Sequence, residues 1–281
     1  MTTATVRRLQ VGQVLRTLRE SAGFGLDQAG KIIGKSASSM SRIERGITGL
    51  PPHALKKITV SLGAAACQDV DVEWVLELGR GSQERGRWSG YRRVYDKHAR
   101  MAIDLEEDSS VVKTYCHERI PDLLQDENYV RAQLPEETAD DIVEALLERQ
   151  WILTKTDPAE LNFVLSESSL RRMVGDREVM RAQLAHLARI MLFDHVQVQV
   201  LPFRARTAPR ASYDFQLFRI PSPAPAGPLQ FVYRESYTDG HYLDERPHLD
   251  AYADLWRRLT AAALGPVESR EFLLRVAGEY L

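Results

Sequence analysis

Two short segments with a helical pattern, separated by a glycine, restrict the folds that this chain can adopt. In the first, LDQAGKII (26–33), apolar residues recur at helical spacing. Gly34 follows as a stop, because glycine readily takes the left-handed conformation of a helix C-terminus. Ser36 is a good N-cap for the second segment, ASSMSRIER (37–45). The pattern predicts two helices packed across a tight turn.

The second helix is predicted to have two different faces at about 100° per residue. The apolar face holds Met40, Ile43 and Ile47, and the opposite face holds Ser38, Arg42 and Arg45, with Ser41 beside them. Small hydroxyl groups permit close approach, and arginines supply charge-assisted hydrogen bonds. A helix-turn-helix that enters the major groove of DNA explains this face better than a solvated capping region does.

More helices surround this pair. A stripe of Val11, Val14, Leu15 and Leu18 indicates a helix before the glycine-containing break SAGFG (21–25). Residues 50–64 and 70–79 predict a fourth and a fifth helix, the fourth with Leu55, Ile58 and Leu62 inward. We therefore expect residues 1–80 to form an all-α DNA-binding bundle.

Charge is distributed unevenly along the chain. Residues 1–100 carry 17 Lys and Arg against 9 Asp and Glu, whereas the remaining residues carry 20 against 30. A basic first third suggests an end that binds an anionic partner. Chance segregation on solvated surfaces is the alternative, and charge alone does not decide between the two.

The first region resembles a known family. LRTLRESAGFGLDQAGKIIGKSASSMSRIERG, with its SRIERG ending, is similar to the lambda-repressor-type (Cro/C1, or XRE) helix-turn-helix. The resemblance implies that Ala37, Ser38 and Arg42 read base edges, and that Ser36 and Arg45 contact the DNA backbone. In that family Ala is usual where this chain has Gly30, which still permits close packing of the two helices.

The predicted DNA-binding set combines both lines of reasoning. It comprises Gln28, Lys35, Ser36, Ala37, Ser38, Ser39, Ser41, Arg42 and Arg45. Lys56 and Lys57 could touch phosphate, but exposed lysines on a helix are more often simply solvated.

Residues 81–108 are expected to connect two domains. The stretch GRGSQERGRWSGYRRVYDKHAR (79–100) interleaves arginine with Trp88, Tyr91 and Tyr95. It could follow a DNA backbone, but we favour a connector whose aromatic rings pack on the second domain.

Residues 109–281 predict an α+β domain with a central sheet and helical cover. The expected strands are 110–118, 161–167, 196–203, 213–220, 229–236 and a shorter one at GHYLD (240–244). The expected helices are 121–133, 136–154, 176–192, 246–264 and 267–280. The domain is predicted to mediate dimerisation and to bind an effector or a partner.

Catalysis has little support in the sequence. His117, Glu118, His241 and the acidic segment 136–148 lack metal-ligand spacing. We expect no catalytic residues, no metal site and no cofactor, so an enzyme is the weaker hypothesis. Alternating aromatic residues in the strands could line a ligand pocket but more often form core or interface. They are Tyr213, Phe215, Phe218, Phe231, Tyr233 and Tyr242.

A second resemblance covers this larger region. TYCHERIPDLLQDENYVRAQL (114–134) is similar to the Y-x-x-x-x-I-P-G-L-L-Q-T-x-x-Y signature of WhiJ-like actinobacterial regulators, with Asp122 at the usual glycine. SESSLRRMVGDREVMRAQLAHL (166–187) and YADLWRRLTAAALGPVESREFL (252–273) are similar to later parts of the same domain. The resemblance implies an antitoxin-like regulator, often encoded beside a small partner protein.

The leading hypothesis is a sequence-specific transcriptional regulator that binds double-stranded DNA as a homodimer and responds to a small partner protein or a small-molecule effector. In the alternative, binding of a small neighbour-encoded protein is the main role, and DNA binding is autoregulation. Two cysteines, Cys67 and Cys116, form no disulfide framework. With no membrane-length apolar run and no signal-peptide pattern, we expect a cytoplasmic protein.

Overall fold

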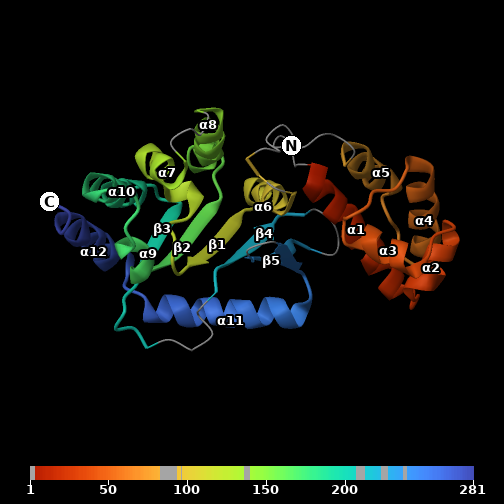
Figure 1. Ribbon diagram of the computed structural model, residues 1–281. Coiled ribbons are helices and arrows are strands. Elements are labelled where there is room, and N and C mark those ends of the chain that lie inside the picture. The colour runs from red at the N-terminus through yellow and green to blue at the C-terminus, as the bar shows by residue number, and fades with distance from the viewer. Residues whose placement is uncertain are drawn as a thin grey trace. The chain divides into compact units, whose positions relative to one another are not determined.

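The chain divides into two compact units in the computed structural model (Figure 1). Unit 1 comprises residues 1–90 with 220–229, and unit 2 comprises residues 91–219 with 230–281. The structure describes residues 4–82, 94–95, 97–135, 140–206, 213–222, 227–236 and 239–281. Trp88 and Tyr91 of the predicted connector lie outside these residues.

Unit 1 contains the predicted helical bundle. Its helices are α1 (Ala4–Ser21), α2 (Leu26–Ile32), α3 (Ala37–Glu44), α4 (Pro52–Ala65) and α5 (Val72–Gly81). The bundle core is formed by Val11, Val14, Leu15, Leu18, Ala29, Met40, Ile43, Leu50, Leu55, Ile58, Leu62 and Val75. The predicted stripes of the first and fourth helices are thus confirmed, since each fills this core.

The apolar face of α3 is shorter than predicted. Met40 and Ile43 are buried, but Ile47 is 48% exposed. The helix ends at Glu44, and the chain then turns at Gly46, whose φ is +65°. The placement of Ile47 on the docking face was therefore wrong, because helical spacing does not continue beyond the turn.

Close approach of α1 to α3 depends on Gly12. A Cβ atom at this position would lie 2.3 Å from the backbone oxygen of Glu44 and 2.9 Å from that of Ile43. Backbone atoms cannot rotate away, so we expect Gly12→Ala to lower the free energy of unfolding of unit 1 by about 1–3 kcal/mol. Gly278→Ala, where a Cβ meets open space, is the matched control. Equal stability of the two variants in hydrogen exchange of α3 would contradict the expectation.

Unit 2 is built on a six-stranded sheet with strand order β3-β2-β1-β4-β5-β6. The strands are β1 (Val111–Cys116), β2 (Glu160–Ser166), β3 (Val196–Leu201), β4 (Phe215–Ile220), β5 (Leu229–Glu235) and β6 (Gly240–Leu243). β1, β2 and β3 are parallel, whereas β4 is antiparallel to β1, and β6 to β5. All six strands were predicted, and the predicted α+β class is confirmed.

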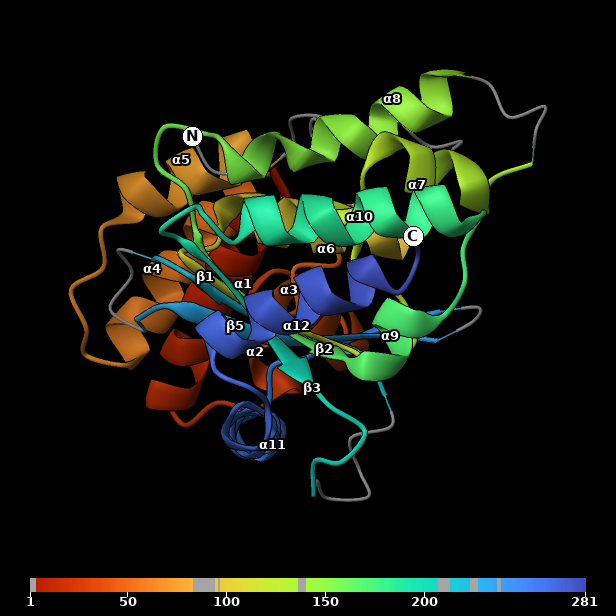
Figure 2. The ribbon, with the colours of Figure 1, turned by 90° about the vertical axis from the view of Figure 1, so that its left-hand side faces the viewer.

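The helices of unit 2 lie on both sides of the sheet. They are α6 (Lys97–Asp108), α7 (Glu127–Gln133), α8 (Asp140–Glu148), α9 (Glu167–Arg171), α10 (Arg177–Ile190), α11 (Arg246–Ala262) and α12 (Pro266–Gly278). Figures 1 and 2 show α11 along one face, with α7, α8 and α10 on the other. Trp256 and Leu259 of α11 pack on Tyr115, Val164 and Val232 of the sheet.

Two predicted helices of unit 2 are interrupted. The 121–133 segment is a 3-10 turn, Asp122–Leu124, followed by α7, because the Asp126 side chain caps α7 at the Tyr129 N–H. The 136–154 segment is α8 followed by a 3-10 helix, Arg149–Leu153, and residues 136–139 lie outside the described ranges. Both breaks place charged side chains near the end of β1.

Within the described residues, no helix has the length and apolar character that crossing a membrane requires.

Candidate functional site

The turn between α2 and α3 is tight because of two glycines. Gly34 has φ +67°, the left-handed conformation that the sequence predicted there. Gly30 approaches the chain so closely that a Cβ atom would lie 2.4 Å from the Lys35 carbonyl oxygen. The predicted close packing at Gly30 is confirmed, and an alanine at this position would require the turn to shift.

Serine side chains cap the start of α3. The Ser36 hydroxyl accepts a hydrogen bond from the Ser39 N–H at 3.2 Å, as predicted for an N-cap, and lies 3.0 Å from the Ser39 hydroxyl. Gln28 has a similar role in α2, where its Oε1 accepts a hydrogen bond from the Gly25 N–H at 2.8 Å. Three of the predicted DNA-contact residues therefore also stabilise helix ends.

The polar face of α3 is open to solvent. Ser38, Arg42 and Arg45 are exposed, and so is Lys35 in the preceding turn, whereas Ala37, Ser39 and Ser41 are half-buried. The Arg45 Nε donates to the Ser41 carbonyl at 3.3 Å, which holds this side chain along the helix. Burial of Met40 beneath the helix fixes the orientation of this face.

A buried ion pair holds the end of α3 to α1. The Arg19 guanidinium donates to both carboxylate oxygens of Glu44, at 2.6 and 2.9 Å, and to the Phe24 carbonyl at 3.0 Å. Hydrogen bonding to Glu44 raises the pKa of Arg19 above its usual value. Arg19 is not part of the predicted apolar stripe of this helix, and helical periodicity alone gives no sign of the pairing with Glu44.

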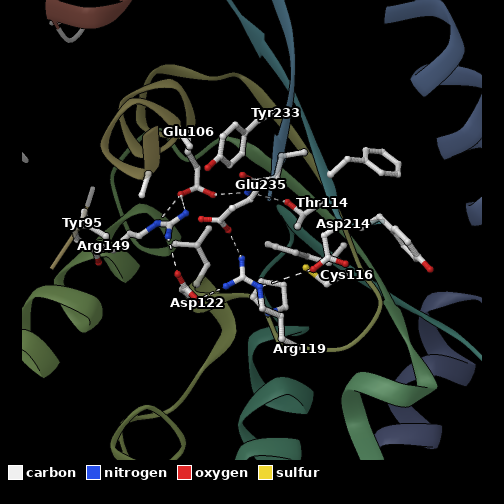
Figure 3. A pocket seen from close by; sticks show the side chains of 18 of the residues that line it. Tyr95, Glu106, Thr114, Cys116, Arg119, Asp122, Arg149, Asp214, Tyr233 and Glu235 are labelled. Carbon is white, nitrogen blue, oxygen red and sulfur yellow. Dashed lines mark hydrogen bonds and ion pairs between the residues drawn. The ribbon is translucent and has the colours of Figure 1, made fainter. Parts of the chain in front are cut away.

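Unit 2 contains a cavity of about 350 Å³ beside the carboxyl end of β1 (Figure 3). The sheet contributes Thr114, Tyr115, Cys116, Phe163, Phe215, Gln216, Tyr233 and Glu235. The helices and loops contribute Val94, Tyr95, Ala99, Ala102, Glu106, Arg119, Pro121, Asp122, Leu123, Leu146, Arg149 and Asp214. The wall thus combines aromatic rings with six charged side chains.

Arg149 joins two carboxylates in the cavity wall. Its Nε donates to Glu106 at 3.0 Å, and its Nη1 donates to Asp122 at 3.1 Å. Burial would lower the pKa of Arg149, but these carboxylates outweigh it and raise that pKa. Burial also raises the pKa of Glu106, an effect that Arg149 only partly offsets.

Arg119 lies among three carboxylates, one of which, Asp122, also contacts Arg149, as Figure 3 shows. Its Nη2 donates to Glu235 at 3.1 Å, and its nitrogens lie 3.8 Å from Asp122 and 3.9 Å from Asp214. Asp214 also accepts a hydrogen bond from the backbone N–H of His117 at 2.8 Å, and the His117 ring lies 2.5 Å from it.

The remaining wall is aromatic and weakly reactive. Burial raises the pKa of Tyr115 to about 12 and raises the pKa of the Cys116 thiol, so both groups stay protonated at neutral pH. Tyr95 donates a hydrogen bond to the Ala145 carbonyl at 3.1 Å, which anchors the start of unit 2 to α8.

Two family models match the chain. Residues 10–69 match a helix-turn-helix domain, and residues 99–275 match a domain of unknown function, DUF5753. The second match covers more than half of the sequence. The chain belongs to the DUF5753 family. Searches of curated proteins and of solved structures give no match.

The two matches coincide with the two sites. The helix-turn-helix match includes α2 and α3 and supports a DNA-binding regulator. The DUF5753 match includes every residue of the cavity wall except Val94 and Tyr95.

The aromatic strand residues of the DUF5753 domain divide among three environments. Phe215 and Tyr233 line the cavity, as the pocket hypothesis expected, whereas Phe218 and Phe231 are buried in the core. Tyr213 is 63% exposed. The Tyr242 ring lies 4.8 Å from that of Tyr233.

The charged residues of the cavity were not predicted as a site. Arg119 and Asp122 follow β1, Asp214 precedes β4, and Glu235 ends β5, so polar residues at strand ends were the available signal. To predict a site from these residues, one must also know which strands are neighbours in the sheet. Within the described ranges, no group of three or more His, Cys, Asp or Glu side chains is placed to hold a metal ion.

Proposed function

We propose that this protein is a sequence-specific transcriptional regulator whose α3 enters the major groove of double-stranded DNA. The observation that carries the proposal is the exposed Ser38–Arg42–Arg45 face on a helix fixed by its buried side. A slim, basic helix of this kind reaches base edges without steric conflict.

The roles within α3 are divided by position. Ala37, Ser38 and Arg42 read bases, whereas Lys35, Ser36 and Arg45 contact phosphates and set the register of the helix on DNA. Gln28, Ser39 and Ser41 support these contacts from the turn and from the helix itself. The charge excess of residues 1–100 favours the same partner.

The protein binds DNA as a homodimer. The DUF5753 domain responds to a small partner protein or a small-molecule effector. One helix-turn-helix covers only a half-site, so two copies on half-sites one DNA turn apart multiply affinity and specificity. The domain acts by binding and not by catalysis: Arg149 and Arg119 hold carboxylates of its cavity in ion pairs.

Fluorescence anisotropy with DNA from the upstream region of the gene, against a scrambled duplex over a salt series, tests this function. We expect wild-type protein to discriminate by about 10³ or more. Arg42→Ala should weaken binding to the specific site by about 10- to 100-fold and relax base preference. Arg45→Ala should weaken both duplexes similarly and reduce the salt slope by about 1.

Arg80→Ala, an exposed arginine of α5, is the matched control for loss of one positive charge. Equal losses on specific and scrambled DNA for Arg42→Ala would disprove its base-reading role. Weak, strongly salt-dependent binding without discrimination would disprove specific regulation. It would favour the antitoxin-like alternative, in which binding of a small partner protein is the main role.

A further inference from the structure

We propose that the cavity of the DUF5753 domain binds a small organic cation, an amine attached to a flat apolar group. The role of this ligand as a signal rests on the proposed regulatory function. Its binding to the cavity does not depend on DNA and can be measured separately. The proposal depends on the charge, the aromatic wall and the position of the cavity.

Among the described residues of the cavity wall, negative charge exceeds positive charge. There Glu106, Asp122, Asp214 and Glu235 face two guanidinium groups, Arg119 and Arg149. Arg149 is already held by two carboxylates, and Arg119 by Glu235 with two more nearby. His117 adds a positive charge at Asp214 only when it is protonated. An ammonium group compensates the excess of carboxylates, whereas an anionic ligand adds to it.

Glu235 and Asp214 are the carboxylates best placed for the ligand. Their side chains are 44% and 26% exposed, compared with 1% for Glu106. Glu235 can present its Oε1 to an ammonium group while its Oε2 keeps the hydrogen bond from Arg119. On Asp214, by contrast, the oxygen turned away from Arg119 already contacts His117. Glu106 is held by Arg149, whose Nε donates a hydrogen bond to it at 3.0 Å.

Aromatic rings supply the apolar part of the site. Tyr115, Phe163, Phe215 and Tyr233 line the cavity from the sheet. Aromatic rings attract cations through their faces and stack on flat groups. The volume of about 350 Å³ is within the range of small-molecule sites and suits a ligand with a single ring system.

The cavity is placed where a ligand can reach and influence the chain. It lies at the carboxyl end of a parallel strand, the edge at which α/β sheets commonly bind ligands. Tyr95, Ala99 and Ala102, at and near the start of unit 2, form part of its wall. All three lie within residues 81–108, the predicted connector, so a ligand in the cavity contacts the part of the chain that joins the two domains.

Calorimetric titration of the full-length protein with three matched probes tests the inference. Tryptamine carries the cation, indole-3-propionate carries an anion on the same ring, and 3-ethylindole is neutral. We expect tryptamine to bind at least about tenfold more tightly than either of the others, because only it forms charged hydrogen bonds to the carboxylates. Glu235→Gln should reduce tryptamine affinity about tenfold, whereas Glu271→Gln on the exposed side of α12 should not.

A second variant distinguishes loss of the binding site from an indirect effect of the Glu235→Gln substitution. Ala99→Phe fills the cavity without changing its charge and should abolish tryptamine binding. Ala251→Phe, at an exposed position of α11, should not. Equal or tighter binding of the anion, binding that survives Ala99→Phe, or failure of tryptamine to bind would each overturn the inference. Because calorimetry uses no DNA, these outcomes are distinct from a failure of DNA discrimination, which overturns only the proposed function.

Discussion

Replacing Arg149 with methionine is expected to destabilise unit 2 by about 3–5 kcal/mol, because it leaves Glu106 buried without its ionic partner. The Glu106 side chain is 1% exposed, and it also accepts a hydrogen bond from Gln216 at 3.5 Å. Methionine approximates the length of the arginine stem, so the loss reflects charge more than packing. Hydrogen exchange of β1 peptides measures the effect, with α3 peptides of unit 1 as an internal control.

The loss should depend on pH. Burial raises the pKa of Glu106, and removal of Arg149 raises that pKa further. A carboxyl group whose pKa is raised in the folded protein destabilises the fold only at a pH where it is charged. The loss of stability caused by Arg149→Met should therefore be smaller near about pH 5 than near about pH 8. A deficit that is independent of pH would contradict this account.

A double variant separates charge from packing. Arg149→Met combined with Glu106→Leu removes both charges, and we expect it to recover most of the lost stability. Arg246→Met is the control, since Arg246 and Asp250 form an ion pair with both side chains largely exposed; no measurable change is expected there. If Arg149→Met behaved like Arg246→Met, the buried pair would have no role in stability.

The helix-turn-helix could be predicted closely because its signals are local. Gly34 and Ser36 mark the turn, and the spacing of Met40 and Ile43 marks the buried face. Each signal concerns backbone conformation or periodicity over a few residues, which the sequence specifies directly. The exception, Ile47, lies just beyond a turn at which the helical period no longer holds.

The cavity could not be predicted because its residues are distant in sequence. Glu106 and Arg149 are 43 positions apart, and Arg119 and Glu235 are 116 apart. The proximity of Arg119 and Glu235 follows from the order of strands, in which β4 and then β5 lie on the side of β1 opposite to β2. A single sequence specifies strands through alternation but not which strands become neighbours.

Asp122 illustrates the limit of a family resemblance. The related signature has glycine there, and the substitution alone suggested no role for the carboxylate. In the structure Asp122 accepts a hydrogen bond from Arg149 and lies near Arg119, and so joins the two charged groups of the cavity.

Arg19→Met is expected to destabilise unit 1 by about 3 kcal/mol or more, because Glu44 would remain buried without its partner. The Glu44 side chain is 4% exposed, and the Arg19 guanidinium also donates to the Phe24 carbonyl. Since Glu44 ends α3, opening of this contact should also release the helix that is proposed to read DNA. Hydrogen exchange of α3 peptides measures the first effect, and anisotropy with the specific duplex measures the second.

Arg16→Met is the matched control on the same helix. Arg16 lies 3.6 Å from Glu20, and the two side chains are 37% and 60% exposed, so its loss should change stability by less than about 1 kcal/mol. Combining Arg19→Met with Glu44→Leu removes the buried charge and should restore protection of α3, and with it DNA binding. If the double variant regained stability but not affinity, the pair would act on DNA recognition by a route other than holding α3 in place. If Arg19→Met matched Arg16→Met in both measurements, the connection between this pair and the recognition helix would be disproved.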